Sequence, residues 1–314
     1  MDNLTHSLVG ALLGQAGLKR RTGLAMPALI IGANLPDIDA TCVIYGTESL
    51  AMRRGLTHGP LALVILPVVL AALLYAFDRW QARRGTRPEG RLPVRFGWLV
   101  ALSFLACLTH PALDWLNVYG IRLLAPFSQR WFYGDTLFIV DWVPWLVMGF
   151  ATWLSWRRDR HGLATWRRPA RYGLAFLGIY IALNGILTGM AERVGAGLAP
   201  EPTVLIASPA PGQPWKRDII FADSTLRWYQ VGWTPLGLQG QPLMMEPNQC
   251  PVEVADLPRS SAIDAFLFWS RAPLFARGDD GAVTLYDARF YDPRTRGRFA
   301  VNLPGLQCER PPAP

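Results

Sequence analysis

The stretch LALVILPVVLAALLYAF, residues 61–77, runs without a single charged side chain. An α-helix of about 20 apolar residues crosses the roughly 30 Å hydrocarbon core of a bilayer with its backbone polar groups satisfied. Three more apolar blocks of similar length follow, at 96–116, 136–156 and 172–190, with Asp114 and Asp141 as their only acids. Helices buried in a large soluble core are the alternative. Four such blocks favour four transmembrane helices.

The composition agrees with a membrane protein, because 51% of the 314 residues are hydrophobic and only 17% are charged. Soluble domains usually carry about 25% charged residues. Two shorter apolar stretches, 8–18 and 24–35, come first and are separated by KRRTG. At about 1.5 Å per residue they are too short to span comfortably, so they predict a helical hairpin that is either partly submerged in the membrane or packed inside the bundle. The acidic start MDNLTH is unlike a cleavable signal peptide.

The pattern changes near residue 200, where prolines accumulate and short alternating runs such as TVLIAS, RDIIFAD and AVTLYDARF begin. GDDG at 278–281 is typical of a turn between two strands. The predicted fold is therefore an α-helical integral membrane bundle with a C-terminal, mostly-β domain. It has four long transmembrane helices and a short N-terminal hairpin. We place the membrane domain at 1–195 and the extracytoplasmic β-rich domain at 196–314.

Lysine and arginine predict the orientation. The segments 19–21, 78–95 and 157–171 hold 15 of them, whereas the loops at the other end hold 5. Positive loops stay inside, so we expect a multi-pass protein of the bacterial cytoplasmic (inner) membrane with a periplasmic C-terminal domain. There Cys250 and Cys308 could form a disulfide, two free thiols being the alternative. The net charge of +8 suits anionic headgroups of the lipid bilayer and calls for no nucleic acid.

Three of the four histidines, His6, His58 and His110, lie in the tripeptide LTH and are spaced 52 residues apart both times. An internal repeat would place each at the same point of a recurring unit. His58 instead precedes one predicted helix and His110 nearly ends the next. We therefore expect the chain to return three times to the same outer membrane face.

Aspartates are predicted at the same face. Asp114 follows His110 by four residues on one helix, which puts both on one side of it. Asp37 and Asp39 follow the hairpin and would share a face if the chain is extended there. Asp135 lies at the outer mouth of the third long helix and Asp141 deeper. One such residue alone is usually structural, but several together near a membrane indicate a functional site.

Imidazoles and carboxylates without a convincing thiol suit a divalent metal. Zinc is favoured, with manganese or iron open. The number of candidate ligands also allows two ions, an arrangement used in ester and phosphoester cleavage.

Five motifs occur in order: THSLVG, NLPDID, RRGLTHG, HPALDWLNVYG and APFSQRWFYGDTLFIVDW. Together they resemble the YdjM-type inner-membrane family of metal-dependent hydrolases, which is distantly similar to zinc-dependent phospholipase C. The resemblance covers about residues 1–145 and leaves out the β domain. Members often carry a histidine near Arg53, where this chain departs. The resemblance implies six metal-ligand candidates: His6, Asp37, Asp39, His58, His110 and Asp114. Asp135 and Asp141 are supporting residues, and we count Asp141 with the metal site as well.

The resulting hypothesis is a membrane-bound hydrolase that cleaves phosphoester bonds of a lipid or membrane-associated substrate with metal-activated water. Asp39 or Asp135 would act as base or as orienting carboxylate. Arg53 and Arg54 would hold the phosphate, or else are solvated loop charges. Two rival hypotheses are a non-catalytic membrane scaffold with a structural metal and a transporter or proton relay. The last predicts mid-membrane charges and related halves, which the sequence lacks.

Overall fold

A computed structural model describes residues 1–306, except 251, 253–256, 279 and 294. The chain divides into two compact units. One comprises residues 1–40 and 54–183, and the other residues 41–53 and 184–314. The division falls inside the long helix α7 (Arg167–Gly195), and the predicted boundary between 195 and 196 lies at the end of that helix.

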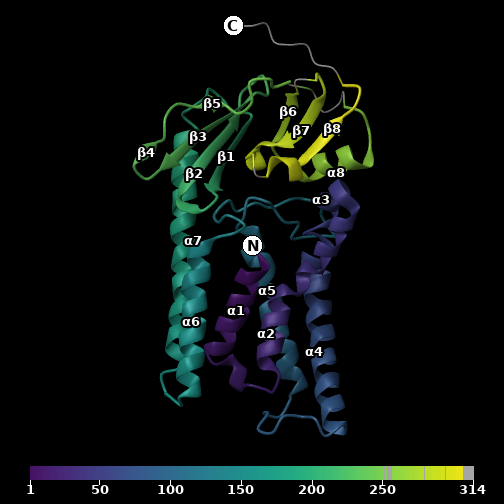
Figure 1. Ribbon diagram of the computed structural model, residues 1–314, viewed down its shortest axis with the longest axis vertical. Coiled ribbons are helices and arrows are strands. Elements are labelled where there is room, and N and C mark those ends of the chain that lie inside the picture. Colours follow the sequence, from purple (N-terminus) through teal and green to yellow (C-terminus); the bar gives the residue numbers. More distant parts are fainter. Residues whose placement is uncertain (251, 253–256, 279, 294, 307–314) are drawn as a thin grey trace. The chain divides into compact units, whose positions relative to one another are not determined.

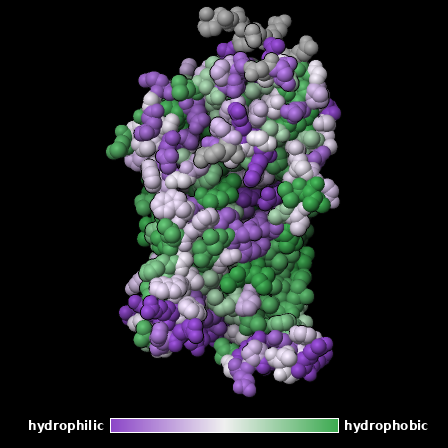
Figure 2. All heavy atoms as spheres, viewed as in Figure 1, coloured by the Kyte–Doolittle hydropathy of each residue, from purple (hydrophilic) through white to green (hydrophobic). Residues whose placement is uncertain are grey.

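The first unit is helical. In it α2 packs against α1 and α5, α4 packs against α5, and α6 packs against α1 (Figure 1). Hydrophobic side chains cover much of these helices on the visible face, while hydrophilic ones gather at the ends where the loops after α4 and α6 lie (Figure 2). The helices are α1 (Asn3–Gln15), α2 (Ala25–Asn34), α4 (Pro60–Arg83), α5 (Phe96–Trp115), α6 (Trp142–Arg160) and the first part of α7.

The predicted fold class is confirmed: helices able to span a membrane precede a domain of antiparallel sheets. Among the described residues, four helical segments are long and apolar enough to cross a bilayer: Ala25–Met52, Pro60–Arg83, Phe96–Trp115 and Arg167–Gly195. Three of them coincide with predicted blocks. The fourth predicted block, 136–156, is replaced in this set by Ala25–Met52, which joins α2 to the 3-10 helix Leu35–Glu48 and to α3 (Ser49–Met52).

The helix in the region of the predicted block 136–156 begins six residues late, at Trp142, and continues beyond the block to Arg160. Asp141 caps α6, accepting a hydrogen bond from the Val143 amide at 3.0 Å, and Pro144 is tolerated in the first turn. Residues 136–140 are irregular, and the amides of Thr136 and Leu137 bond to the Leu116 carbonyl. The charged run that begins at residue 157 then ends the apolar part.

Close packing of α1 on α2 depends on a glycine. A Cβ added at Gly10 would lie 2.5 Å from the carbonyl oxygen of Leu29. The two helix backbones therefore approach closely, and they share the first unit's core with α5. This approach holds the first turn of α1, which carries His6, beside the other helices.

The second unit contains two antiparallel sheets and the helix α8 (Ser261–Trp269). The first sheet has the order β1-β2-β3-β4, with β5 also paired to β3, and the second has the order β6-β7-β8. Strands β6 and β7 pair on either side of the turn predicted at 278–281. The strands are β1 (Val204–Ala210), β2 (Gln213–Ala222), β3 (Trp228–Thr234), β4 (Gly237–Leu238), β5 (Leu243–Met244), β6 (Pro273–Arg277), β7 (Val283–Asp287) and β8 (Ala300–Leu303).

A disulfide bond and the hydrogen bonds of a buried arginine stabilise the second unit. Cys250 is disulfide-bonded, whereas Cys42 and Cys107 are free thiols; Cys308 lies outside the described residues. The buried guanidinium of Arg217 on β2 donates to Thr188 Oγ1 and to both oxygens of Asn184, each at 2.9 Å. These bonds tie the last turns of α7 to the first sheet.

Candidate metal centre

The three LTH histidines meet in the helical unit. His6 is on α1, His58 ends the 3-10 turn Leu56–His58 before α4, and His110 is near the end of α5. All three side chains are 0% exposed. The ring of His110 stacks on that of His6 at 3.8 Å between centroids and meets that of His58 edge-on at 4.9 Å.

Two of these histidines form a group with two aspartates. One ligand atom each from Asp37, His58, His110 and Asp114 lies within 4.8 Å of the others. His58 Nε2 is 3.5 Å from Asp114 Oδ2 and 3.9 Å from Asp37 Oδ1. His110 Nε2 is 3.6 Å from each of the same two oxygens. Ligands about 2.0–2.1 Å from a tetrahedral ion would be about 3.3 Å apart, so these four pairs, at 3.5–3.9 Å, would have to close by a few tenths of an ångström.

The hydrogen bonding of this group also fits a cation. Within the described part of the chain, His58 Nε2 and His110 Nε2 are buried without a hydrogen-bond partner, and Asp114 Oδ2 is buried with only the ion pair to Arg54 Nε at 3.1 Å. Leaving buried polar atoms unsatisfied is costly, typically by 1–3 kcal/mol each. All three atoms face the same point, and a divalent ion there would satisfy them together.

The opposite ring nitrogens are held by other groups. His110 Nδ1 donates to the carbonyl of Ala33 at 2.7 Å, which leaves the lone pair of Nε2 facing the centre. His58 Nδ1 lies 2.9 Å from Thr57 Oγ1 and 3.4 Å from Asp39 Oδ2. Such partners orient metal-binding imidazoles and increase their basicity.

Asp37 and Asp39 do not share a face. The chain around them is a 3-10 helix, not the extended segment that the sequence analysis considered, and residues two apart on such a turn diverge. Asp37 points to the histidines, whereas Asp39 Oδ2 accepts bonds from the Arg54 amide at 2.8 Å and from Thr57 Oγ1 at 2.7 Å. Asp39 therefore braces the segment that carries His58.

Asp114 is the hub of the centre. Its Oδ2 lies 3.1 Å from Arg54 Nε, while its Oδ1 faces His6 Nε2 at 3.4 Å and contacts the N-terminal amine of Met1. Burial lowers the pKa of His6 to about 4, although Asp114 partly opposes this, so His6 is neutral at pH 7. Burial also acts to lower the pKa of His58, but the nearby carboxylates of Asp114 and Asp39 outweigh it and raise that pKa.

The other predicted site residues are not in the four-residue group. Asp141 caps α6 and accepts a hydrogen bond from the Tyr180 hydroxyl at 2.6 Å. Asp135 is in the irregular segment before α6, with a φ of 46°. Arg53 belongs to the second compact unit, whereas Arg54 belongs to the first.

Sequence reasoning assigned no role to the residues that hold Arg54. The Arg54 guanidinium donates to Asn117 Oδ1 at 2.8 Å and to the Gly120 carbonyl at 3.4 Å, and it lies over the Tyr119 ring at 4.7 Å. All three partners come from the NVYG segment directly after α5. In the sequence, these residues were marked only by the position of NVYG after the DW at the end of α5, within the motif HPALDWLNVYG.

Comparison with known proteins identifies the family. A family model described as YdjM inner membrane protein matches residues 1–191. The chain belongs to the YdjM inner membrane protein family. It is also similar to the "Uncharacterized protein YfhP" of Bacillus subtilis (strain 168), at 25% identity over 95% of this chain and 88% of that relative. No solved structure matches this chain.

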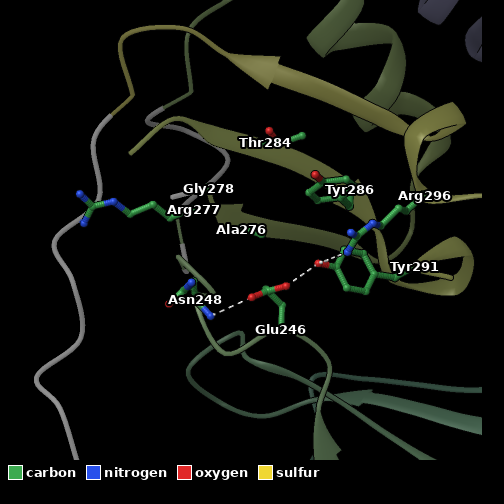
Figure 3. A pocket seen from close by; sticks show the side chains of 9 residues that line it. All are labelled: Glu246, Asn248, Ala276, Arg277, Gly278, Thr284, Tyr286, Tyr291 and Arg296. Carbon is green, nitrogen blue, oxygen red and sulfur yellow. Dashed lines mark hydrogen bonds between the residues drawn. The ribbon is translucent and has the colours of Figure 1, made fainter. Parts of the chain in front are cut away.

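The match to the YdjM family contains every residue of the centre and ends within α7. The second unit also carries a polar pocket, beyond the matched residues, with a volume of about 270 Å³. In it the Tyr291 hydroxyl donates to Glu246 Oε2 at 2.7 Å, and Arg296 approaches the same hydroxyl (Figure 3). None of the predicted site residues lines this pocket.

Proposed function

We propose that this YdjM-family protein is a membrane-bound, metal-dependent hydrolase that cleaves phosphoester bonds in a lipid or membrane-associated substrate. The observation that supports this most is the buried group of Asp37, His58, His110 and Asp114, whose ligand atoms lie within 4.8 Å of one another. Two imidazoles and two carboxylates are a donor set for zinc, and manganese or iron would also suit it.

The four residues would hold the ion through Asp37 Oδ1, His58 Nε2, His110 Nε2 and Asp114 Oδ2. A divalent cation bound there would supply Lewis acidity, which polarises an ester oxygen and makes water more acidic. The two oxygens of Asp114 face different partners, because Oδ1 is directed to His6 at 3.4 Å and also contacts the Met1 amine. A second ion next to the first would use Oδ1 and His6 and would take the place of that amine.

Arg54 would provide positive charge for a phosphate. Arg54 as a whole is 5% exposed. Its guanidinium is held by Asn117, the Gly120 carbonyl and the Tyr119 ring. A planar, permanently charged and preorganised group suits a developing phosphoryl charge. Asp39, whose Oδ1 is buried and has no hydrogen-bond partner among the described residues, would orient His58 and accept a proton; Asp135 is the alternative acceptor.

We also infer that the centre opens to the periplasmic side and that the β-rich unit is periplasmic. The uneven distribution of arginine and lysine supports this orientation. The disulfide at Cys250 agrees with it, since disulfides persist in oxidising compartments.

One observation favours a second candidate, a membrane scaffold with a structural metal. Four protein ligands are enough to close a tetrahedral shell, whereas catalytic zinc usually has three and keeps one open position. Structural zinc sites, however, are mostly built with cysteine, and Cys107 is not in the group.

Metal content and activity should be measured on the same purified samples. Wild type, His110→Ala and Asp114→Asn would be compared by elemental analysis and by hydrolysis of bis-p-nitrophenyl phosphate and short-chain phospholipids. Asp264→Asn, which is exposed and outside the centre, serves as the matched control. We expect only the first two variants to lose both metal and activity. Equal metal and activity in all variants would reject the centre, and metal without activity in the wild type would favour the scaffold.

A further inference from the structure

Helix α6 exposes an apolar stripe that ends in a basic cluster. Trp142, Leu146, Phe150, Trp153 and Trp156 follow one another at intervals of three or four residues, which places them on one face of the helix. Each of these side chains is between 44% and 64% exposed. The opposite face is buried, with Met148 and Ala151 packed in the core with α1 and α7. The stripe therefore faces away from the bundle.

At the C-terminal end of this stripe is a pocket of about 460 Å³. It is lined by Trp153, Trp156, Arg157, Arg160 and His161. The guanidinium of Arg157 lies over the Trp153 ring at 5.5 Å, and that of Arg160 lies over the Trp156 ring at 5.0 Å. Stacking on indole rings restricts both guanidinium groups while leaving their N–H donors available.

The acid within this charged run is engaged elsewhere. Asp159 accepts hydrogen bonds from Lys19 Nζ at 2.6 Å and from Arg20 at 2.8 Å. Within the described part of the chain, neither Arg157 nor Arg160 has a carboxylate oxygen within 4.0 Å. The pocket thus presents two guanidinium groups beside an imidazole, and none of the carboxylates that the structure describes lies within 4.0 Å of either guanidinium.

We propose that this face of α6 binds an anionic phospholipid. Its acyl chain lies along Leu146, Phe150 and Trp153, and its phosphate lies between Arg157 and Arg160, with His161 beside it. An apolar stripe continuous with a cationic pocket complements an amphiphile with a negative headgroup, and neither part alone would select one. The helix C-terminus itself repels anions, so the attraction must come from the two guanidinium groups.

This site is separate from the metal centre and does not depend on the hydrolase proposal. A lipid site would also explain why α6 exposes both aromatic side chains and charges. It is the one long helix of the first unit that is not apolar enough to count among the four candidate spans. Bound lipid would cover its aromatic stripe and neutralise the charges at its end.

The test is lipid retention by purified full-length protein in detergent, measured by native mass spectrometry with dioleoyl phosphatidylglycerol or dioleoyl phosphatidylcholine. The site variant is Arg157→Gln with Arg160→Gln. The control is Arg158→Gln with Arg168→Gln, which removes the same charge from the same region but from residues that do not line the pocket. Circular dichroism confirms that both variants keep their helices.

We expect wild type and control to retain phosphatidylglycerol in preference to phosphatidylcholine. Each basic residue near an anionic headgroup strengthens binding roughly fivefold, so the site variant should bind phosphatidylglycerol roughly thirtyfold more weakly. Equal losses in both double variants would show general charge attraction and overturn the site. Equal retention of the two lipids would also overturn it. Complete displacement by millimolar inorganic phosphate would show an anion site without the acyl stripe and reject the lipid as occupant.

Discussion

The imidazole of His6 stacks on that of His110 with 3.8 Å between ring centroids and 18° between ring planes. One ring comes from the first turn of α1 and the other from near the end of α5. Their contact is possible because α1 and α5 both pack against α2. The same packing places Asp114 between His6 on one side and His58 on the other.

Asp37 and Asp39 should have different effects on metal binding. Asp37→Asn replaces an anionic ligand oxygen with a neutral, weakly basic amide oxygen, so it should alter the absorption spectrum of the Co²⁺-loaded protein. Asp39→Asn alters only what holds His58 and Arg54, so the spectrum should persist while affinity falls by roughly 10–100-fold. Chelator competition measures the affinity. Unchanged Co²⁺ spectra in Asp37→Asn would contradict the assignment.

Gly10→Ala should loosen α1. The added Cβ would lie 2.5 Å from the Leu29 carbonyl oxygen, and overpacking of this kind typically costs about 1–3 kcal/mol. Metal affinity should fall as well, because His6 is one turn away. The control is Gly149→Ala on α6, where a Cβ meets nothing within 4 Å and alanine favours the helix. Thermal unfolding of both variants decides this, and equal melting temperatures would refute the close approach.

Asp159 should stabilise the protein in a pH-dependent manner. Hydrogen bonds and charges of Lys19 and Arg20 outweigh the effect of burial and hold the pKa of Asp159 below its usual value. A depressed pKa in the folded state means that the stabilisation is present above about pH 4 and is lost as the pH falls through the folded-state pKa. Asp159→Asn should lower the melting temperature at pH 7, by an amount equivalent to at most about 1 kcal/mol. The difference in melting temperature between this variant and wild type should become smaller in acid. A difference that became larger in acid would contradict the expected sign of the pH dependence.

Loss of the disulfide should destabilise the second unit. Cys250→Ser should reduce its stability by about 2–5 kcal/mol, as is typical when a native bridge is removed from a small disulfide-bonded domain. Cys42→Ser, which replaces a free thiol of the same unit, is the control and should change little. Unfolding measured with and without reductant tests both variants. A wild-type transition that does not respond to reductant would contradict the expectation.

Much of the architecture could be read from local patterns. The blocks at 61–77, 96–116 and 172–190 became α4, α5 and α7 because a long apolar run has few other stable arrangements. The β-rich unit could also be predicted from local sequence, because strands show alternating hydrophobic residues and turns are rich in proline and glycine. These patterns begin near residue 200.

The members of the metal group could not be predicted from local sequence in this way, because the group depends on contacts between distant segments. Spacing suggested that Asp37 and Asp39 act together, yet the 3-10 turn separates them, and Asp141 is used to cap α6. The cradle of Arg54 could not be foreseen, because Asn117 and Gly120 reach it only after the chain folds back from α5. Local sequence sets which segments are helical and apolar; which side chains then face one another depends on helix packing, and that is a property of the whole fold.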